Sequence, residues 1–131
     1  MKPIIIFLLA VCVLTLVGCG DRGVEPVPPS PARPDTPTNL RAEITGWATN
    51  VAVAIVKVSW EHSGKNVQGF VLSRGNQNSG WMRVATIELP AKSYIDGIVK
   101  PGDMSEGVSY LLQAYNEAGL SDTVTCNMAT Y

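Results

Sequence analysis

The chain has 131 residues, of which 46% are apolar, and its formal net charge is −1. This length predicts one domain rather than two, and the near-neutral charge excludes the basic field that binds nucleic acid. The apolar residues are unevenly spread, because 14 of the 60 fall within residues 1–18. The 113 residues that follow are about 41% apolar, which is ordinary for a soluble domain.

The first segment has the pattern of an export signal. Lys2 is the only early charge, and residues 4–17 are almost wholly apolar. The segment ends in the tetrapeptide Leu-Val-Gly-Cys at residues 16–19, which resembles the lipobox of bacterial lipoproteins. The resemblance implies removal of residues 1–18 as a signal peptide. It also implies a diacylglycerol on the Cys19 sulfur and acylation, as by palmitate, of the new amine.

An uncleaved membrane-spanning anchor is the alternative interpretation of this segment. The uncharged stretch covers residues 3–20, which is barely enough to cross ~30 Å of hydrocarbon. Gly20 stands where, in bacteria with two membranes, an aspartate would favour retention at the inner membrane. The sequence therefore predicts a lipid-anchored protein of the cell envelope, at the outer membrane rather than the inner one where two are present.

A proline-rich segment follows the cysteine. Residues 19–37 contain prolines at positions 26, 28, 29, 31, 34 and 37, and proline disfavours both helix and sheet because it lacks an amide donor. We expect an extended, solvated tether that holds a domain away from the membrane. A proline-rich ligand for a groove-type binding domain is the other interpretation, although the prolines do not form a convincing paired motif.

The remaining residues, 38–131, have the pattern of an all-β domain. Short alternating apolar runs are separated by turn residues, and no helical period appears. The runs predict strands at residues 40–44, 51–60, 70–72, 81–87, 93–99, 110–114 and 124–128. Seven short antiparallel strands are typical of a two-sheet immunoglobulin-like sandwich. Trp60 and Tyr110 fall on the inward face and are expected in its core.

Several short motifs occur in a fixed order along this domain. They are Pro37-x-x-Leu40-x-Ala42, Val58-Ser59-Trp60-Glu61, Gly69-Phe70-Val71-Leu72, Tyr94-x-Asp96, and Tyr110-x-Leu112-x-Ala114-x-Asn116-x-x-Gly119-x-Ser121. The ordered set resembles a fibronectin type III domain over residues 37–131. The resemblance implies that Trp60 is the core tryptophan of the second strand. This sequence departs from the family at Val108, where the family has a tyrosine whose hydroxyl bonds to the backbone. Tyr110 is the candidate to fill the space of that tyrosine.

Catalytic and metal-binding constellations are not apparent in the sequence. His62 is the one histidine, and we expect it to be a solvated turn residue rather than part of a serine hydrolase triad. After processing, the cysteines would be Cys19 and Cys126, and the alternation around Cys126 predicts a small core side chain. We therefore expect a protein that is not an enzyme and that uses no metal or cofactor.

Three aromatic residues are candidates for binding. Trp47 lies in a predicted Gly46–Ala48 turn, Trp81 begins a strand, and Tyr115 faces away from the inward residues of its strand. Exposed aromatic rings can stack on sugars or anchor a protein interface, and local packing over a sheet edge is the alternative for each. The sequence predicts a membrane-anchored, non-catalytic binding module with a protein or polysaccharide ligand. A structural spacer or accessory subunit of an envelope complex is the alternative.

Overall fold

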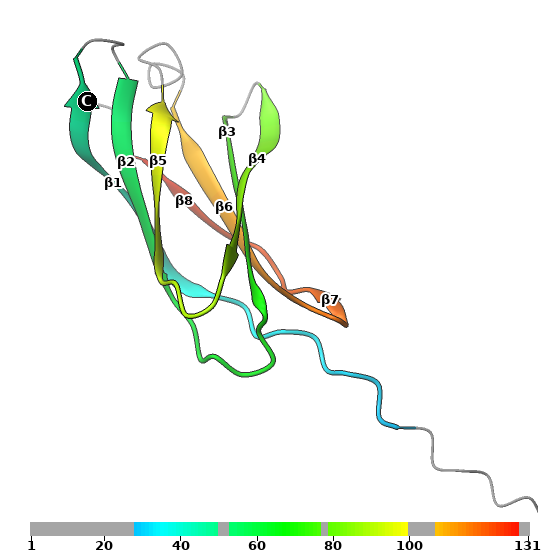
Figure 1. Ribbon diagram of the computed structural model, residues 1–131. Helices are drawn as coiled ribbons and strands as arrows, with labels where there is room; N and C mark the ends of the chain where they lie inside the picture. Colours follow the sequence, from blue (N-terminus) through cyan, green and yellow to red (C-terminus); the bar gives the residue numbers. More distant parts are fainter. Residues whose placement is uncertain (1–27, 50–52, 77–78, 100–106, 129–131) are drawn as a thin grey trace, which may run out of the picture.

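The computed structural model describes residues 28–49, 53–76, 79–99 and 107–128. The predicted leader, Cys19 and most of the predicted tether lie outside the described residues. Within them the chain forms two antiparallel β-sheets packed face to face (Figure 1). This is the all-β sandwich that the sequence predicts, and its arrangement is consistent with an immunoglobulin-like or fibronectin type III fold.

The first sheet has three strands, in the order β1-β2-β5. Its strands are β1 (Thr38–Ala48), β2 (Val53–Glu61) and β5 (Ser93–Val99). The second sheet has β3 (Gly69–Asn76) between β4 (Gly80–Glu88) and β6 (Ser109–Asn116), and β7 (Gly119–Leu120) and β8 (Val124–Asn127) both pair with β6. The described residues therefore form eight strands, whereas the sequence predicted seven.

The extra strand is β7 (Gly119–Leu120), which lies between the sixth and seventh predicted strands and ends just before Ser121. The Ser121 N–H donates to the Ala114 carbonyl at 2.9 Å, and the Ser121 hydroxyl oxygen accepts from the Ala114 N–H at 2.9 Å. A side-chain oxygen thus occupies the place of a backbone acceptor in the ladder. Ser121 is buried, so these bonds satisfy polar groups that water does not reach.

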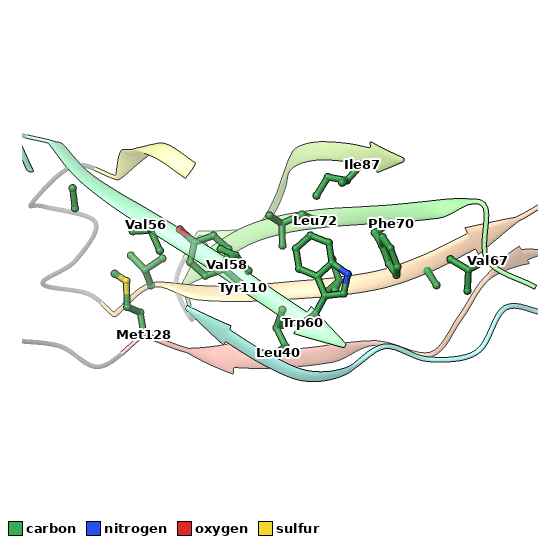
Figure 2. Packing of buried hydrophobic residues seen from close by; sticks show 14 residues of the cluster. Leu40, Val56, Val58, Trp60, Val67, Phe70, Leu72, Ile87, Tyr110 and Met128 are labelled. Carbon is green, nitrogen blue, oxygen red and sulfur yellow. The ribbon is translucent and has the colours of Figure 1, made fainter. Parts of the chain in front are cut away.

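The core lies between the sheets and is built from the inward positions of the strands (Figure 2). On β2 the alternation of buried and less buried residues is complete from Val53 to Glu61, as a half-buried strand requires. Trp60 meets Phe70 edge to face, with ring centroids 5.3 Å apart and an interplanar angle of 62°. Tyr110 is fully buried in the same cluster, so both predicted core aromatics lie inside.

The segment before β1 is docked on the sandwich, which differs from the solvated tether that the prolines predicted. Arg33 donates from Nε and Nη2 to the Leu120 carbonyl, at 3.0 and 2.6 Å. Asn116 Nδ2 donates to the Ala32 carbonyl at 2.8 Å, and Pro34 and Pro37 are buried. Proline excludes pairing in a sheet but not packing against one, so residues 32–37 belong to the folded unit.

The sandwich has two distinct ends (Figure 1). We call the end where residues 32–37 enter β1 the tether end, and it also holds the connections from β2 to β3 and from β4 to β5. We call the opposite end the far end. There β1 finishes at Ala48, β3 finishes at Asn76 and β4 begins at Gly80.

Candidate functional site

Two of the three predicted binding aromatics lie at the far end and are exposed there. Trp47 is one residue from the end of β1, and Trp81 is the second residue of β4. Trp47 is 51% exposed and Trp81 is 50% exposed. These are large fractions for tryptophan, whose burial stabilises most folds strongly. The two rings belong to different sheets, so they are presented from two sides of the same end.

Trp47 lies just after a bulge in β1. The pairing of β1 with β2 shifts between Ile44 and Gly46, after which Trp47 pairs with Ala54. The sequence predicted a turn at Gly46–Ala48, and this is wrong, because pairing continues to Ala48 opposite Val53. Ile44, Thr45, Gly46 and Trp47 line a hollow of about 500 Å³. The tryptophan therefore forms one wall of a concave surface rather than the tip of a turn.

Trp81 lies over a glycine of the neighbouring strand. It pairs with Gly75 of β3, and a Cβ added at Gly75 would lie 3.1 Å from Trp81 Cε3 and would collide with the Gly80 carbonyl oxygen. The ring therefore needs the bare backbone of Gly75 beneath it. Met82, the next residue, is 59% exposed. An exposed tryptophan and an exposed methionine are thus adjacent at the start of the edge strand β4.

Tyr115 is placed at the tether end and not with the tryptophans. It pairs with Gly69 of β3, and a Cβ at Gly69 would lie 2.7 Å from Tyr115 Cε1. Tyr115 is half-buried by this contact. The structure therefore does not bring the three predicted aromatics into one site. It brings Trp47 and Trp81 to one end, together with Met82, which the sequence analysis missed.

A buried polar cluster joins the two sheets below the far end. The Tyr110 hydroxyl donates to Asp96 Oδ2 at 3.0 Å, and Arg74 Nη1 lies 2.5 Å from the same oxygen. Asp96 is on β5 of one sheet, and Arg74 and Tyr110 are on β3 and β6 of the other. We call these three residues the cross-sheet cluster. A buried carboxylate requires such partners, because burial of an unpaired charge is costly.

At Val108 the sequence departs from the fibronectin type III pattern that it resembles, and Tyr110 is the residue predicted to fill the space of that pattern's tyrosine. Val108 is itself a buried core residue, and the Tyr110 hydroxyl bonds to a carboxylate rather than to the backbone. The Tyr110 hydroxyl is thus used in a bond between side chains, and its place relative to the pattern's tyrosine stays a prediction. Burial raises the pKa of Tyr110 well above its ordinary value, and the Asp96 charge raises it further. The phenol therefore stays protonated as a donor and has a structural role.

His62 is not the solvated turn residue that the sequence predicted. Its ring packs against Phe70 with centroids 4.9 Å apart, and both ring nitrogens are enclosed without a hydrogen-bond partner. The neighbouring Ser63 hydroxyl donates to Asp35 Oδ2 at 2.5 Å rather than to the histidine. The side chain thus lies against the Phe70 ring of the core. No nucleophile is paired with His62 among the described residues.

Cys126 has the placement that the alternation predicts. Its half-buried side chain packs against the core, and the thiol is free. Burial raises the pKa of the thiol, and a backbone hydrogen bond from Tyr110 partly opposes that rise. A raised pKa leaves less of the reactive thiolate near neutral pH. Cys126 is therefore a packing residue in the folded domain.

The described residues include neither a metal-binding cluster nor a membrane-spanning helix. In the part of the chain that the structure describes, His, Cys, Asp and Glu side chains form no group of three or more that could hold a metal ion. The same residues include no helix with the length and apolar character that a membrane crossing needs. The sequence matches no protein-family model and no curated protein. We therefore base the functional proposal on the exposed residues and the contacts of the described chain.

Proposed function

We propose that this chain is a bacterial lipoprotein whose domain, of fibronectin type III kind, is a non-catalytic binding module of the cell envelope. A lipid on Cys19 would hold it to the membrane, at the outer membrane in a cell that has two. The ligand would be an envelope protein or a polysaccharide. We include no cofactor and no metal in this proposal.

One observation carries the binding role, namely the exposure of Trp47 and Trp81 at the far end. Residues 32–37 enter the sandwich at the tether end (Figure 1), so an anchor at Cys19 would join the chain at the end opposite Trp47 and Trp81. Tryptophan and methionine are enriched where proteins meet. The far end would thus be the part of an anchored domain that other envelope components reach first.

Photocrosslinking in cells tests the binding role directly. A benzoyl-phenylalanine at position 47 or 81 should give discrete crosslinked products, because each side chain would lie in the interface. Position 95 is the matched control, since Ile95 is also about half exposed but lies on β5 away from the far end. Equal products from all three positions, or none from 47 and 81, would count against the proposal. Mass spectrometry of the products separates a protein ligand from a glycan.

The anchor is tested separately by Cys19→Ser. The wild-type protein should float with membranes and carry the added mass of acyl chains, since two or three buried chains hold firmly. The Cys19→Ser variant should lose that mass and keep residues 1–18. A variant that is still cleaved and acylated would contradict the lipid anchor and leave the far-end interface to be judged on its own data.

The spacer alternative has a specific observation in its favour. Arg33 and Asn116 hold residues 32–37 against the sandwich, so the domain would leave its tether in a set direction, as a spacer requires. The crosslinking experiment separates the two functions. A spacer would give no discrete product from the far end.

A further inference from the structure

The outer face of the three-stranded sheet has a polar hollow near the tether end. Its volume is about 380 Å³, within the range of about 300–1,000 Å³ that is usual for small-molecule sites. Its floor is the cross-strand pair Ser59 and Ser93, and Arg41 of β1 pairs with Ser59 on the other side. The hollow forms because two short hydroxyl side chains lie side by side among longer neighbours.

The lining of this hollow is positively charged. Arg41, Lys57 and Lys92 line it, which are three of the ten lysines and arginines in a chain of net charge −1. Glu61 is the one acidic residue among the described lining residues. The side chains thus contribute a formal excess of two positive charges at one place.

None of these three cations makes an ion pair within the described part of the chain, although Glu43 is the cross-strand neighbour of Lys57. The ion pairs there join Arg33 to Asp122 and Arg74 to Asp96. Glu61 is instead bonded to Asn39, whose Nδ2 donates to Glu61 Oε2 at 2.8 Å. Because Asn39 adopts a positive φ of 53° in the bulge at the start of β1, this amide and carboxylate are held together at the rim.

The backbone holds two of the cations in place. Arg41 lies in the paired part of β1 opposite Ser59. The Trp60 N–H donates to the Lys92 carbonyl at 3.0 Å, which extends the pairing of β2 with the start of β5. The Cα positions of Arg41 and Lys92 are therefore set by the sheet, and only their side chains must order when a ligand binds.

We propose that this hollow binds a phosphate group. A phosphate monoester carries close to two negative charges, which matches the excess of the lining, and its oxygens accept several hydrogen bonds at once. The arginine fork and the lysine ammonium groups are suited to those oxygens, and the two serine hydroxyls of the floor are further donors. A single carboxylate has one charge and two oxygens, and it would leave part of this donor set unused.

The phosphate can be carried by a membrane headgroup or by a free phosphate compound. The hollow adjoins the tether end, since Asn39 is two residues after Pro37 and β1 starts there (Figure 1). A headgroup at this place would turn the outer face of the β1-β2-β5 sheet toward the membrane. All the lining residues lie between positions 39 and 93. The site therefore does not depend on lipid attachment at Cys19 or on a ligand at the far end.

The test is an NMR titration of the full-length chain in neutral maltoside micelles. One arm adds inorganic phosphate, and the other adds phosphatidic acid, whose headgroup is a phosphate monoester, to the micelles. Saturable shifts of the Ser59 and Ser93 amides in the first arm assign a free phosphate compound. Shifts in the second arm alone assign a headgroup. Absence of saturable shifts in both arms would overturn the proposal.

Two double variants distinguish a site from general charge attraction. Arg41→Gln with Lys92→Gln should weaken binding roughly tenfold or more, because two charged hydrogen-bond donors are lost. Lys65→Gln with Arg83→Gln removes the same two charges outside the hollow and should leave the affinity within about twofold, since screening in salt limits distant charges. Equal weakening by both variants would also overturn the proposal. Thermal melts establish that each variant is folded.

Discussion

The Tyr110 hydroxyl and the Asp96 carboxylate join the two sheets across the core at 3.0 Å. Tyr110 is fully buried and Asp96 is 3% exposed, so water does not replace either partner. The third member, Arg74, supplies the positive charge that a buried carboxylate needs. The cluster is thus a polar link between the two sheets.

Substitutions in the cross-sheet cluster should lower the free energy of unfolding by different amounts. Arg74→Met should cost about 3–5 kcal/mol, because it leaves the buried Asp96 charge without its counter-charge. Tyr110→Phe should cost about 1 kcal/mol, since Asp96 keeps Arg74. The triple variant Arg74→Met, Asp96→Leu, Tyr110→Phe should recover most of the first loss, because no charge stays buried. Urea unfolding measures all three, and a larger loss for Tyr110→Phe than for Arg74→Met would contradict this account.

The raised pKa of Tyr110 predicts a loss of stability in alkali. The unfolded phenol releases its proton near its ordinary pKa of 10.0, whereas burial and the Asp96 charge keep the folded phenol protonated. The folded state therefore binds more protons above about pH 10, and the free energy of unfolding falls as pH rises through that value.

The matched control for this pH dependence is Tyr110→Phe. The variant should lose stability less steeply with pH above about 10 than the wild type does, and the two curves should run parallel below it. Urea unfolding at a series of pH values gives the slopes. Parallel curves throughout the alkaline range would show that Tyr110 ionises in the folded state as easily as in the unfolded one.

The aromatic–glycine pairs predict that two glycines of β3 tolerate no side chain. Gly69→Ala should cost roughly 1–3 kcal/mol, because its Cβ would lie 2.5 Å from the Ile87 carbonyl oxygen and 2.7 Å from Tyr115 Cε1. Gly75→Ala should cost a similar amount through its clash with the Gly80 carbonyl. Thermal or urea unfolding provides the measurement.

Gly97→Ala is the control for these two substitutions. A Cβ at Gly97 meets nothing within 4 Å, and alanine also restricts the unfolded chain, so stability should change by less than about 0.5 kcal/mol or rise slightly. A cost at Gly97 equal to that at Gly69 would mean that general strand preference, rather than the close contact, sets the loss.

The docked segment predicts a local change without loss of the fold. Arg33→Gln removes the bonds to the Leu120 carbonyl, and Asn116→Asp removes the donations to the Ala32 and Asn66 carbonyls while keeping an acceptor for the Ala118 N–H. The double variant that carries both substitutions should show higher backbone mobility of residues 32–36 on the nanosecond timescale, as measured by the heteronuclear NOE. Lys65→Gln, which removes an exposed charge elsewhere, should leave that mobility unchanged.

The sequence by itself determined the class of fold and the interior of the sandwich. Alternation with period two predicts the inward positions of Trp60, Tyr110 and Cys126, because successive strand side chains point to opposite faces. The inward phase of Arg74 after Phe70 and Leu72 was also visible and was missed, since a charged residue is rarely expected inside. Its partner Asp96 lies two positions after Tyr94 on β5, on the face of that strand that points inward.

Only the tertiary structure decided which of these residues meet. The bulge between Ile44 and Gly46 shifts the register of β1 against β2, so that Trp47 pairs with Ala54, while the alternation of exposure along β1 continues through Trp47. The contacts of Arg33 with Leu120 and of Arg74 with Asp96 join residues 87 and 22 positions apart, and such pairs depend on strand order and register. Local sequence specifies which face a side chain takes, whereas sheet packing specifies its neighbour. The polar hollow on the outer face of the β1-β2-β5 sheet also depends on tertiary structure, because Arg41, Ser59 and Ser93 become neighbours only when three strands pair.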